Sequence, residues 1–338
     1  MVYLADRAFD ERTARVMLSM LVEPADANVG RLLRTEGAVE TLRLLDSTGP
    51  VPGVQPESAA MLQYAVGQVA SRASFDDDLT RVLDGAYGPL IPGDAHWPAS
   101  VDALGDRAPY MLWTKGATSF LTAPTHDRVT ITGSRAATSY GEHVATELAR
   151  DASLAEQVVV AGGAYGIEGA AHRAVLGSQG HTIAVLAGGL DRPYPHGHSE
   201  LLQRVAGVGL LMSEMPPGST PTRHRFIARG RLLAALSSAT VVVEAGARSG
   251  AMNVAREAHA LGRGVGAVPG PITSAASTGA HLLIRDGVAS VVTGSHDVAG
   301  LMAAHSDAPA RSQRRQAAQS GQKLDDFDLE QNQPGRSL

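Results

Sequence analysis

The sequence predicts an α/β fold, a doubly wound, mostly parallel Rossmann-like sheet that follows a small helical domain. Between residues 129 and 293, short runs of β-branched residues alternate with stretches in which apolar residues recur at helical spacing. Two of these runs, at 158–161 and 240–243, are apolar almost throughout, which suits strands that helices cover on both faces. Ligands of such a sheet bind where strands end, so we look for function at the strand exits.

Composition divides the chain into three parts. In residues 1–85, apolar side chains such as Val16, Met20 and Leu32 recur at helical spacing, which predicts the small helical domain. The sheet domain occupies residues 86–305 and begins with a Pro-, Gly- and Asp-rich stretch that predicts a connector with little regular structure. The polar, Gln-rich residues 306–338 predict a disordered tail.

Composition also excludes several classes of protein. Of the 338 residues 44% are hydrophobic, enough to bury a sizeable core. Cysteine is absent, which excludes disulfides, thiolate metal sites and catalysis by a thiol, and favours a reducing cytoplasm. The N-terminus mixes acids and arginines into its apolar stretch, unlike a signal peptide, and nowhere do about 18 uncharged apolar residues run together, so we expect no membrane partner.

The first strand exit carries Gly133, Ser134 and Arg135, and Thr138 or Ser139 is expected to cap the helix that follows. A glycine lets a phosphate approach the backbone, free N–H groups at the helix start point toward it, and an arginine adds a charge-assisted hydrogen bond. The segment therefore predicts an anion pocket. The alternative is an ordinary turn with a solvated arginine.

The second exit, with Gly162 and Gly163, is also rich in glycine. It is similar to a dinucleotide fingerprint, but Ala161 replaces the first glycine and the next strand ends without the ribose-binding acid, so NAD binding is disfavoured and no cofactor is predicted. The glycines permit close approach of a phosphate or of backbone, and tight packing alone is an equal alternative.

A later strand ends in Glu244, and Ser249 and Gly250 open the next helix, whose N-terminus faces the same edge of the sheet. Glu244 is expected to position its own loop by accepting backbone hydrogen bonds, with a general base as the alternative. His196 and His198 lie near Asp191, but no recognisable ligand set is complete, so no metal site is predicted.

The segment 221–237 concentrates arginines around one aromatic residue, Phe226, in a chain of net charge -5. Its arginines are Arg223, Arg225, Arg229 and Arg231. Proteins that bind single-stranded nucleic acid use cations to neutralise its phosphates and aromatic rings to stack on its bases. The overall negative charge does not argue against this, because screening makes the local potential decisive. The alternative buries Phe226 against the helix and leaves the arginines in solvent.

Taken in order, these segments resemble the DNA-processing protein A family, also called DprA or Smf. The resemblance covers about residues 91–292. Its motifs are Trp97-Pro98, GSR at 133–135, AGGAYGIEGAAH at 161–172, TIAVLAGGLDRPYP at 182–195, SEMPPG at 213–218, FIARGRLLAALS at 226–237, VVVEAGARSGAM at 241–252 and GRGVGAVPGPI at 262–272. The N-terminal helices are similar to the small domain, of the SAM or helix-hairpin-helix kind, that precedes the sheet in this family.

The resemblance implies a cytoplasmic homodimer that binds and protects single-stranded DNA and loads a RecA-type recombinase onto it, without breaking a bond. Protecting the strand and loading the recombinase would be its role in recombination and natural transformation. By motif, the turn at 133–135 and Arg223 would hold phosphates and Phe226 would stack on a base. Arg229 and Arg231 would line the same pocket.

Four positions depart from the family pattern. Glu168 replaces an aspartate, Gly230 replaces an asparagine between two arginines, and His198 replaces the asparagine after Tyr-Pro. Where the family has Gly-Thr-Asn, this chain has residues 278–281, which end in Ala280 and His281. These changes imply a rearranged polar network, and with it a different DNA affinity or ligand choice.

Two other functions stay open from the sequence. A Rossmann-type sensor of a nucleotide ligand, or a nucleotide-hydrolysing enzyme, would use the same strand exits. Val254 stands where the phosphoribohydrolases carry their catalytic glutamate, which disfavours hydrolysis by that mechanism. A scaffold for a protein partner, with a vestigial pocket, is the third possibility. The DNA hypothesis requires that Arg135 and Phe226 converge on one concave surface.

Overall fold

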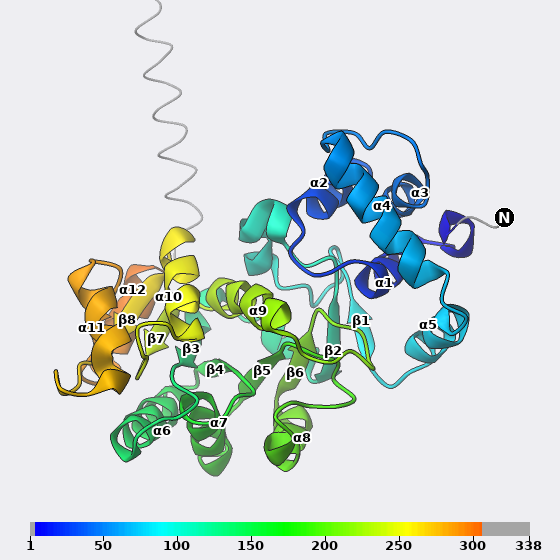
Figure 1. Ribbon diagram of the computed structural model, residues 1–338. Helices are drawn as coiled ribbons and strands as arrows, with labels where there is room; N and C mark the ends of the chain where they lie inside the picture. The colour runs from blue at the N-terminus through cyan, green and yellow to red at the C-terminus, as the bar shows by residue number, and fades with distance from the viewer. Residues whose placement is uncertain (1–3, 306–338) are drawn as a thin grey trace, which may run out of the picture.

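The computed structural model describes residues 4–305, and a nine-stranded sheet forms the centre of this part of the chain (Figure 1). The strands are β1 (Gly88–Leu90), β2 (Leu112–Gly116), β3 (Arg128–Thr132), β4 (Val158–Gly162), β5 (Thr182–Leu186), β6 (Leu210–Ser213), β7 (Ala239–Val242), β8 (Gly264–Ala267) and β9 (Ser290–Val291). Their order is β1-β2-β6-β5-β4-β3-β7-β8-β9. Strands β3 to β9 pair in parallel, and β1 and β2 are antiparallel additions at one edge. The predicted fold class is confirmed.

The strand order reverses at β3. From β3 the chain adds β4, β5 and β6 on one side, and then returns to place β7, β8 and β9 on the other side. Loops that leave β3 and β7 therefore diverge to opposite sides and open a crevice at the carboxyl ends of these two strands. In doubly wound sheets this switch point is where ligands bind.

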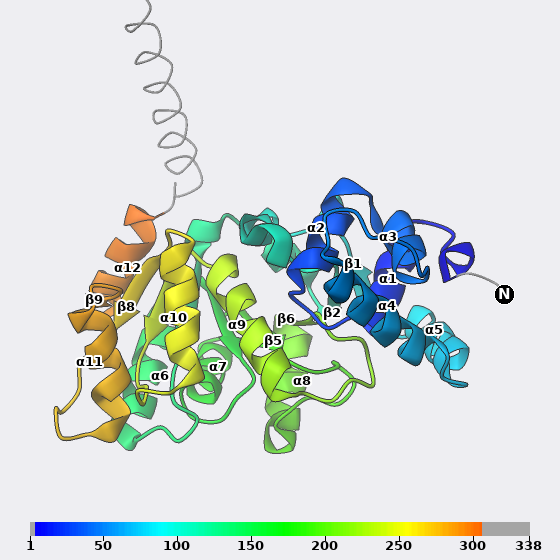
Figure 2. The ribbon, with the colours of Figure 1, turned by 45° about the horizontal axis from the view of Figure 1, so that its top comes forward.

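Helices cover both faces of the sheet (Figure 2). Val129 and Ile131 of β3 point to the face that is covered by α6, α7 and α12, whereas Val242 of β7 points to the face under α9 and α10. Helix α8 packs on β5 and β6, and α11 packs on β8. These helices are α6 (Ser139–Leu154), α7 (Ile167–Gly177), α8 (Ser199–Val208), α9 (Arg223–Leu236), α10 (Gly250–Ala260), α11 (Thr278–Arg285) and α12 (Ser295–Ala304).

The N-terminal region is helical, as predicted, and packs beside the β1–β2 edge of the sheet (Figure 1). It comprises η1 (Leu4–Arg7), α1 (Glu11–Leu21), α2 (Ala27–Thr35), α3 (Ala38–Leu45), α4 (Pro56–Ala70) and α5 (Phe75–Leu83). Asp10 and Asp26 cap α1 and α2 by accepting backbone hydrogen bonds. One apolar cluster joins Met17 and Leu42 of these helices to Trp113 of β2 and Leu202 of α8. The helices and the sheet thus share a core, and the division at residue 85 stays a prediction.

The stretch at 87–109 is more regular than predicted. It contains β1 and a 3-10 helix, η2 (Ala99–Arg107), and β2 follows directly. Its Pro and Gly residues obscured these elements, because β2 owes its form to pairing with β6, and β1 to pairing with β2, and not to local propensity. The predicted tail, 306–338, lies outside the described residues. Within residues 4–305, no helix has both the length and the apolar character needed to cross a membrane.

A buried histidine should make stability depend on pH. The ring nitrogens of His172, in α7, lie 2.9 Å from the Gly162 carbonyl oxygen and 2.9 Å from the Thr182 hydroxyl. Burial lowers the pKa of His172 from 6.5 to about 4. The unfolded chain therefore binds more protons between these values, and the free energy of unfolding falls as the pH is lowered through this window.

We expect the loss of unfolding free energy between about pH 7.5 and pH 5 to be about 2 kcal/mol larger in the wild type than in His172→Gln. Urea unfolding at both pH values measures it. An equal pH dependence of the two proteins would show that the ring titrates normally.

Candidate functional site

The turn after β3 is packed against the end of β7. The Ser134 N–H donates to the Glu244 carbonyl oxygen at 2.6 Å. A Cβ atom at Gly133 would lie 2.7 Å from the same oxygen, closer than real side chains come. Only glycine lets the two backbones approach in this way. The turn then directs the side chain of Arg135 outward, where it is exposed.

Glu244 fixes the loop that carries Arg135. Its carboxylate accepts hydrogen bonds from the Thr138 N–H, at 2.9 Å, and from the Thr138 hydroxyl, at 2.6 Å. Thr138 in turn caps α6, as predicted. The expectation that Glu244 holds its own loop is wrong, because its carboxylate reaches across the switch point to the neighbouring loop. At 2% exposure, it is poorly placed to act as a general base toward a ligand.

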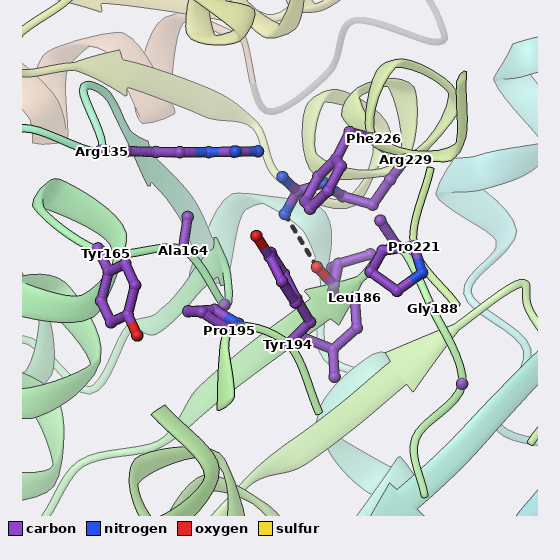
Figure 3. Close-up of a pocket in the computed structure, with 14 residues that line it drawn as sticks. Arg135, Ala164, Tyr165, Leu186, Gly188, Tyr194, Pro195, Pro221, Phe226 and Arg229 are labelled. Carbon is purple, nitrogen blue, oxygen red and sulfur yellow. Dashed lines mark hydrogen bonds between the residues drawn. The ribbon is translucent and has the colours of Figure 1, made fainter. Parts of the chain in front are cut away.

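Arg135 and Phe226 meet at the switch point, although 91 residues separate them in sequence. The guanidinium carbon of Arg135 lies 4.4 Å from the centre of the Phe226 ring (Figure 3). Phe226 is half-buried in the first turns of α9, and the guanidinium of Arg229 lies 6.0 Å from its ring. The structure thus brings together the pair that the DNA hypothesis requires, and the ring is not sealed in the core.

A cleft of about 640 Å³ surrounds this pair, and we call it the switch-point cleft. It lies between the loops that follow β3 and β7 and the first turns of α9 and α10. The predicted site residues that line it are Gly133, Ser134, Arg135, Arg223, Phe226, Arg229, Ser249 and Gly250. Gly163 lines a smaller crevice beside it, which shares Arg135, Phe226 and Arg229.

The switch-point cleft favours anions. Arg135, Arg223 and Arg248 are exposed at its walls, and its lining includes one carboxylate, that of Glu168, which is 4% exposed. The N-termini of α6 and α10 begin at its edges, so their dipoles add positive potential. Ser249 caps α10 through a hydrogen bond from the Ala251 N–H. The arrangement suits a phosphate chain that crosses the carboxyl edge of the sheet.

Gly162 serves the site by leaving room for Arg229. A Cβ atom there would lie 1.7 Å from Nη1 of Arg229. This nitrogen donates to the Val185 carbonyl oxygen at 2.9 Å and lies 3.9 Å from the Glu168 carboxylate. Glu168 also accepts from the Thr132 hydroxyl and the Ala164 N–H. Gly162 itself does not line the cleft.

Arg231 does not line the cleft, so the prediction that it shares the pocket with Arg229 is wrong. Its side chain is 1% exposed and forms a two-pronged ion pair with the buried Glu214, at 2.6 and 2.5 Å. Its Nε atom donates to the Arg107 carbonyl oxygen. Arg231 points into the core beneath α9, and no phosphate can reach it there.

The side chain of Arg225 is also held by an ion pair and is not free to bind a phosphate in the cleft. It pairs with Glu23 of the N-terminal region at 2.7 and 2.9 Å and donates to the Thr220 carbonyl oxygen. This pair ties the start of α9 to the helical region. Of the four arginines around Phe226, Arg223 and Arg229 remain at the cleft.

Sequence reasoning missed three residues. Arg248, exposed in the loop after β7, has the same signal as Arg135, an arginine in a glycine-containing turn between a strand and a helix. Tyr165 and Tyr194 line the smaller crevice. Tyr194 lies in the loop that contains Asp191 and His196, which we considered only as a metal site, and no local pattern marked Tyr165.

Residues at the positions that depart from the family pattern are packed or hydrogen-bonded within the fold. Nδ1 of His198 lies 3.0 Å from the Gly163 carbonyl oxygen, and Nε2 of His281 lies 3.0 Å from that of Gly270. Gly230 faces Val254 where α9 and α10 pack together, and Ala280 is buried. Among residues 4–305, no group of three or more His, Asp or Glu side chains could hold a metal ion.

Comparisons with known proteins agree on one family. A sequence model of the DNA recombination-mediator protein A family matches residues 89–303. The putative DNA processing protein DprA of Mycobacterium tuberculosis H37Rv is 45% identical over 291 residues, which cover 83% of this chain and 72% of that protein. DprA of Streptococcus pneumoniae R6 is 38% identical over 205 residues, 61% of this chain and 71% of that one.

Two solved structures are similar to this chain. The X-ray structure of DprA from Streptococcus pneumoniae has a TM-score of 0.67 and 29% identity, and the match covers 84% of this chain and 94% of that one. A structure of DNA processing protein A from Helicobacter pylori, solved for its unique single-stranded DNA binding mode, has a TM-score of 0.58 and 29% identity. That match covers 64% of this chain and 95% of the other.

Proposed function

The chain belongs to the DNA recombination-mediator protein A family, and from this premise we propose that it binds single-stranded DNA in the switch-point cleft. The observation that carries the proposal is the guanidinium of Arg135, held 4.4 Å from the half-buried ring of Phe226 in a cationic cleft. A phosphate chain and a base need these two groups side by side. The structure of the Helicobacter pylori relative, which was solved for its single-stranded DNA binding mode, supports the same ligand.

The contact between Arg135 and Phe226 gives way when DNA arrives. At an exposed site, a cation over an aromatic ring contributes about 0.5–1 kcal/mol. Stacking of a base on the ring contributes about 1–3 kcal/mol, and the freed guanidinium gains a charge-assisted hydrogen bond to phosphate. Exchange of one contact for two therefore favours the DNA complex. Arg223 and Arg248 continue the cationic wall on either side.

The finer role follows the family. We propose that the bound strand is protected and passed to a RecA-type recombinase, that the chain works as a cytoplasmic homodimer, and that it breaks no bond. Binding without catalysis is supported by the two carboxylates near the cleft, because each already accepts hydrogen bonds from the protein. Glu244 is tied to Thr138, and Glu168 is tied to Thr132 and Ala164.

Fluorescence anisotropy with labelled single- and double-stranded oligonucleotides, at two salt concentrations, tests the proposal. We expect single strands to bind more tightly. Arg135→Ala should reduce the magnitude of the salt slope by about 0.7, the contribution of one phosphate contact on a single strand. Phe226→Ala should weaken binding by roughly 5- to 150-fold with little change in slope, because it removes stacking without removing charge.

Arg81→Ala is the matched control, because Arg81 is exposed on α5, away from the cleft. Equal binding by the wild type, Arg135→Ala and Phe226→Ala would refute the site. A mononucleotide that competes as well as the oligonucleotide would favour the nucleotide sensor instead.

A further inference from the structure

Two more aromatic rings, those of Tyr194 and Tyr165, follow Phe226 along the carboxyl edge of the sheet. The smaller crevice beside the switch-point cleft, which we call the aromatic crevice, is lined by Tyr194, from the loop after β5, and by Tyr165, from the loop after β4. Figure 3 shows these two tyrosines on either side of Ala164 and Pro195, with Phe226 beyond Tyr194. The DNA site proposed above makes use of only one of these three rings.

Tyr194 adjoins the stacking ring. Its ring centre lies 5.9 Å from that of Phe226, and the two rings are inclined at 66°. It remains 50% exposed, so its ring does not serve the core. A base next to the one on Phe226 would meet Tyr194 first.

Tyr165 is held in place by its neighbours but remains partly exposed. Its ring packs edge-on against His198 at 4.5 Å, and the Nδ1 atom of His198 is fixed by the Gly163 carbonyl oxygen. A Cβ atom at Gly197 would lie 2.4 Å from the Tyr165 hydroxyl, so a glycine makes room for the ring. Tyr165 is nevertheless 47% exposed. An aromatic ring that is oriented by its neighbours and left open is suited to stacking.

We propose that Tyr194 and Tyr165 are further stacking platforms, so that a single strand leaving Phe226 continues over the aromatic crevice and places its next bases on these rings. The inference rests on the proposed function. The crevice between the rings is floored by apolar groups, including Leu186 and Pro195, and Arg229 lies in its wall. Bases of any sequence fit such a track, because every base has an aromatic face.

Oligothymidylates lengthened one nucleotide at a time test the track by anisotropy. Tyr165 lies at the far end, so Tyr165→Ala should bind the shortest competent oligonucleotide as the wild type does. It should then bind longer ones about tenfold more weakly, the scale of one lost stacking contact. Tyr194→Ala should lose affinity at shorter lengths than Tyr165→Ala. The salt slope should not change, since neither substitution removes a cation that neutralises a phosphate.

The controls separate stacking from folding. Tyr165→Phe keeps the ring and should restore the affinity, whereas Tyr165→Leu should behave as the alanine variant does. Tyr64→Ala, at a tyrosine that is 70% exposed on α4, should bind every length normally. Thermal unfolding checks that each variant is folded.

Two outcomes overturn the inference alone. If Tyr165→Ala binds all lengths as the wild type does, or weakens all lengths equally, while Phe226→Ala weakens them all, the track is wrong and the proposed function stands. If Phe226→Ala also binds normally, the proposed function itself fails. If the track is wrong and the proposed function stands, the exposed tyrosines would suit a protein partner instead.

Discussion

Replacement of Arg231 by methionine is expected to lower the free energy of unfolding by about 3–5 kcal/mol, because it leaves a buried carboxylate without its partner. Glu214 accepts two hydrogen bonds from Arg231, and both side chains are buried. Two further N–H groups of Arg231 donate to the carbonyl oxygens of Arg107 and Ala228. The pair is buried where α9 meets the end of β6 and the end of η2, so water cannot solvate the carboxylate that is left unpaired.

Urea unfolding measures this effect, and the double variant Arg231→Met with Glu214→Leu should recover most of the loss, since it removes the orphaned charge. Arg150→Met is the surface control. Its pair with Glu147 is exposed, and its loss should cost less than about 1 kcal/mol. Where Arg231→Met is still folded, it should bind single-stranded DNA as the wild type does. Unchanged stability would contradict the importance of the buried pair. A selective loss of DNA binding would show that Arg231 contacts DNA after all.

Replacement of Gly166 by alanine should damage both stability and binding. Gly166 has φ +71°, and a Cβ atom there would lie 2.3 Å from the Ser134 carbonyl oxygen and 2.7 Å from that of Arg135. The strained backbone costs about 1–3 kcal/mol. Because both contacts are with backbone, the turn that carries Arg135 must shift, and affinity for single-stranded DNA should fall by about tenfold or more, toward that of Arg135→Ala.

Gly53→Ala is the matched control for Gly166→Ala. Gly53 has φ +67°, but nothing lies within 4 Å of the added Cβ atom. It should therefore carry the strain of a positive φ without a clash, and keep its DNA affinity. Unfolding curves and anisotropy titrations of both variants separate the two effects. If both variants bind DNA equally well, the position of the turn at 133–135 does not matter for binding.

Much of the fold could be predicted because it is written in local patterns. Apolar runs of strand length alternate with helical periodicity, and a parallel sheet covered on both faces follows from them. The edge strands β1 and β2 escaped this reasoning. Strand β2 is held by pairing with the distant β6, and β1 is held by pairing with β2. The composition of residues 87–109 does not reveal these contacts.

Within α9 the helical periodicity separates Arg229 from Arg231. Arg229 lies three residues after Phe226, about 60° away around the helix axis, and shares its cleft. Arg231 lies five residues after Phe226, about 140° away, and points into the core. Both look alike in a segment read only for its composition and charge.

By itself, the sequence determined the strand exits, the glycine turns and the presence of Arg135 and Phe226, because each depends on residues close together in the chain. Only the tertiary structure decided which of these groups meet. The reversal of strand order at β3 brings residues 133–135 to the start of α9, and it directs Glu244 to the loop of Arg135 and not to its own loop. Contacts of this kind depend on where strands are placed in the sheet, which is a property of the whole chain and not of any one segment.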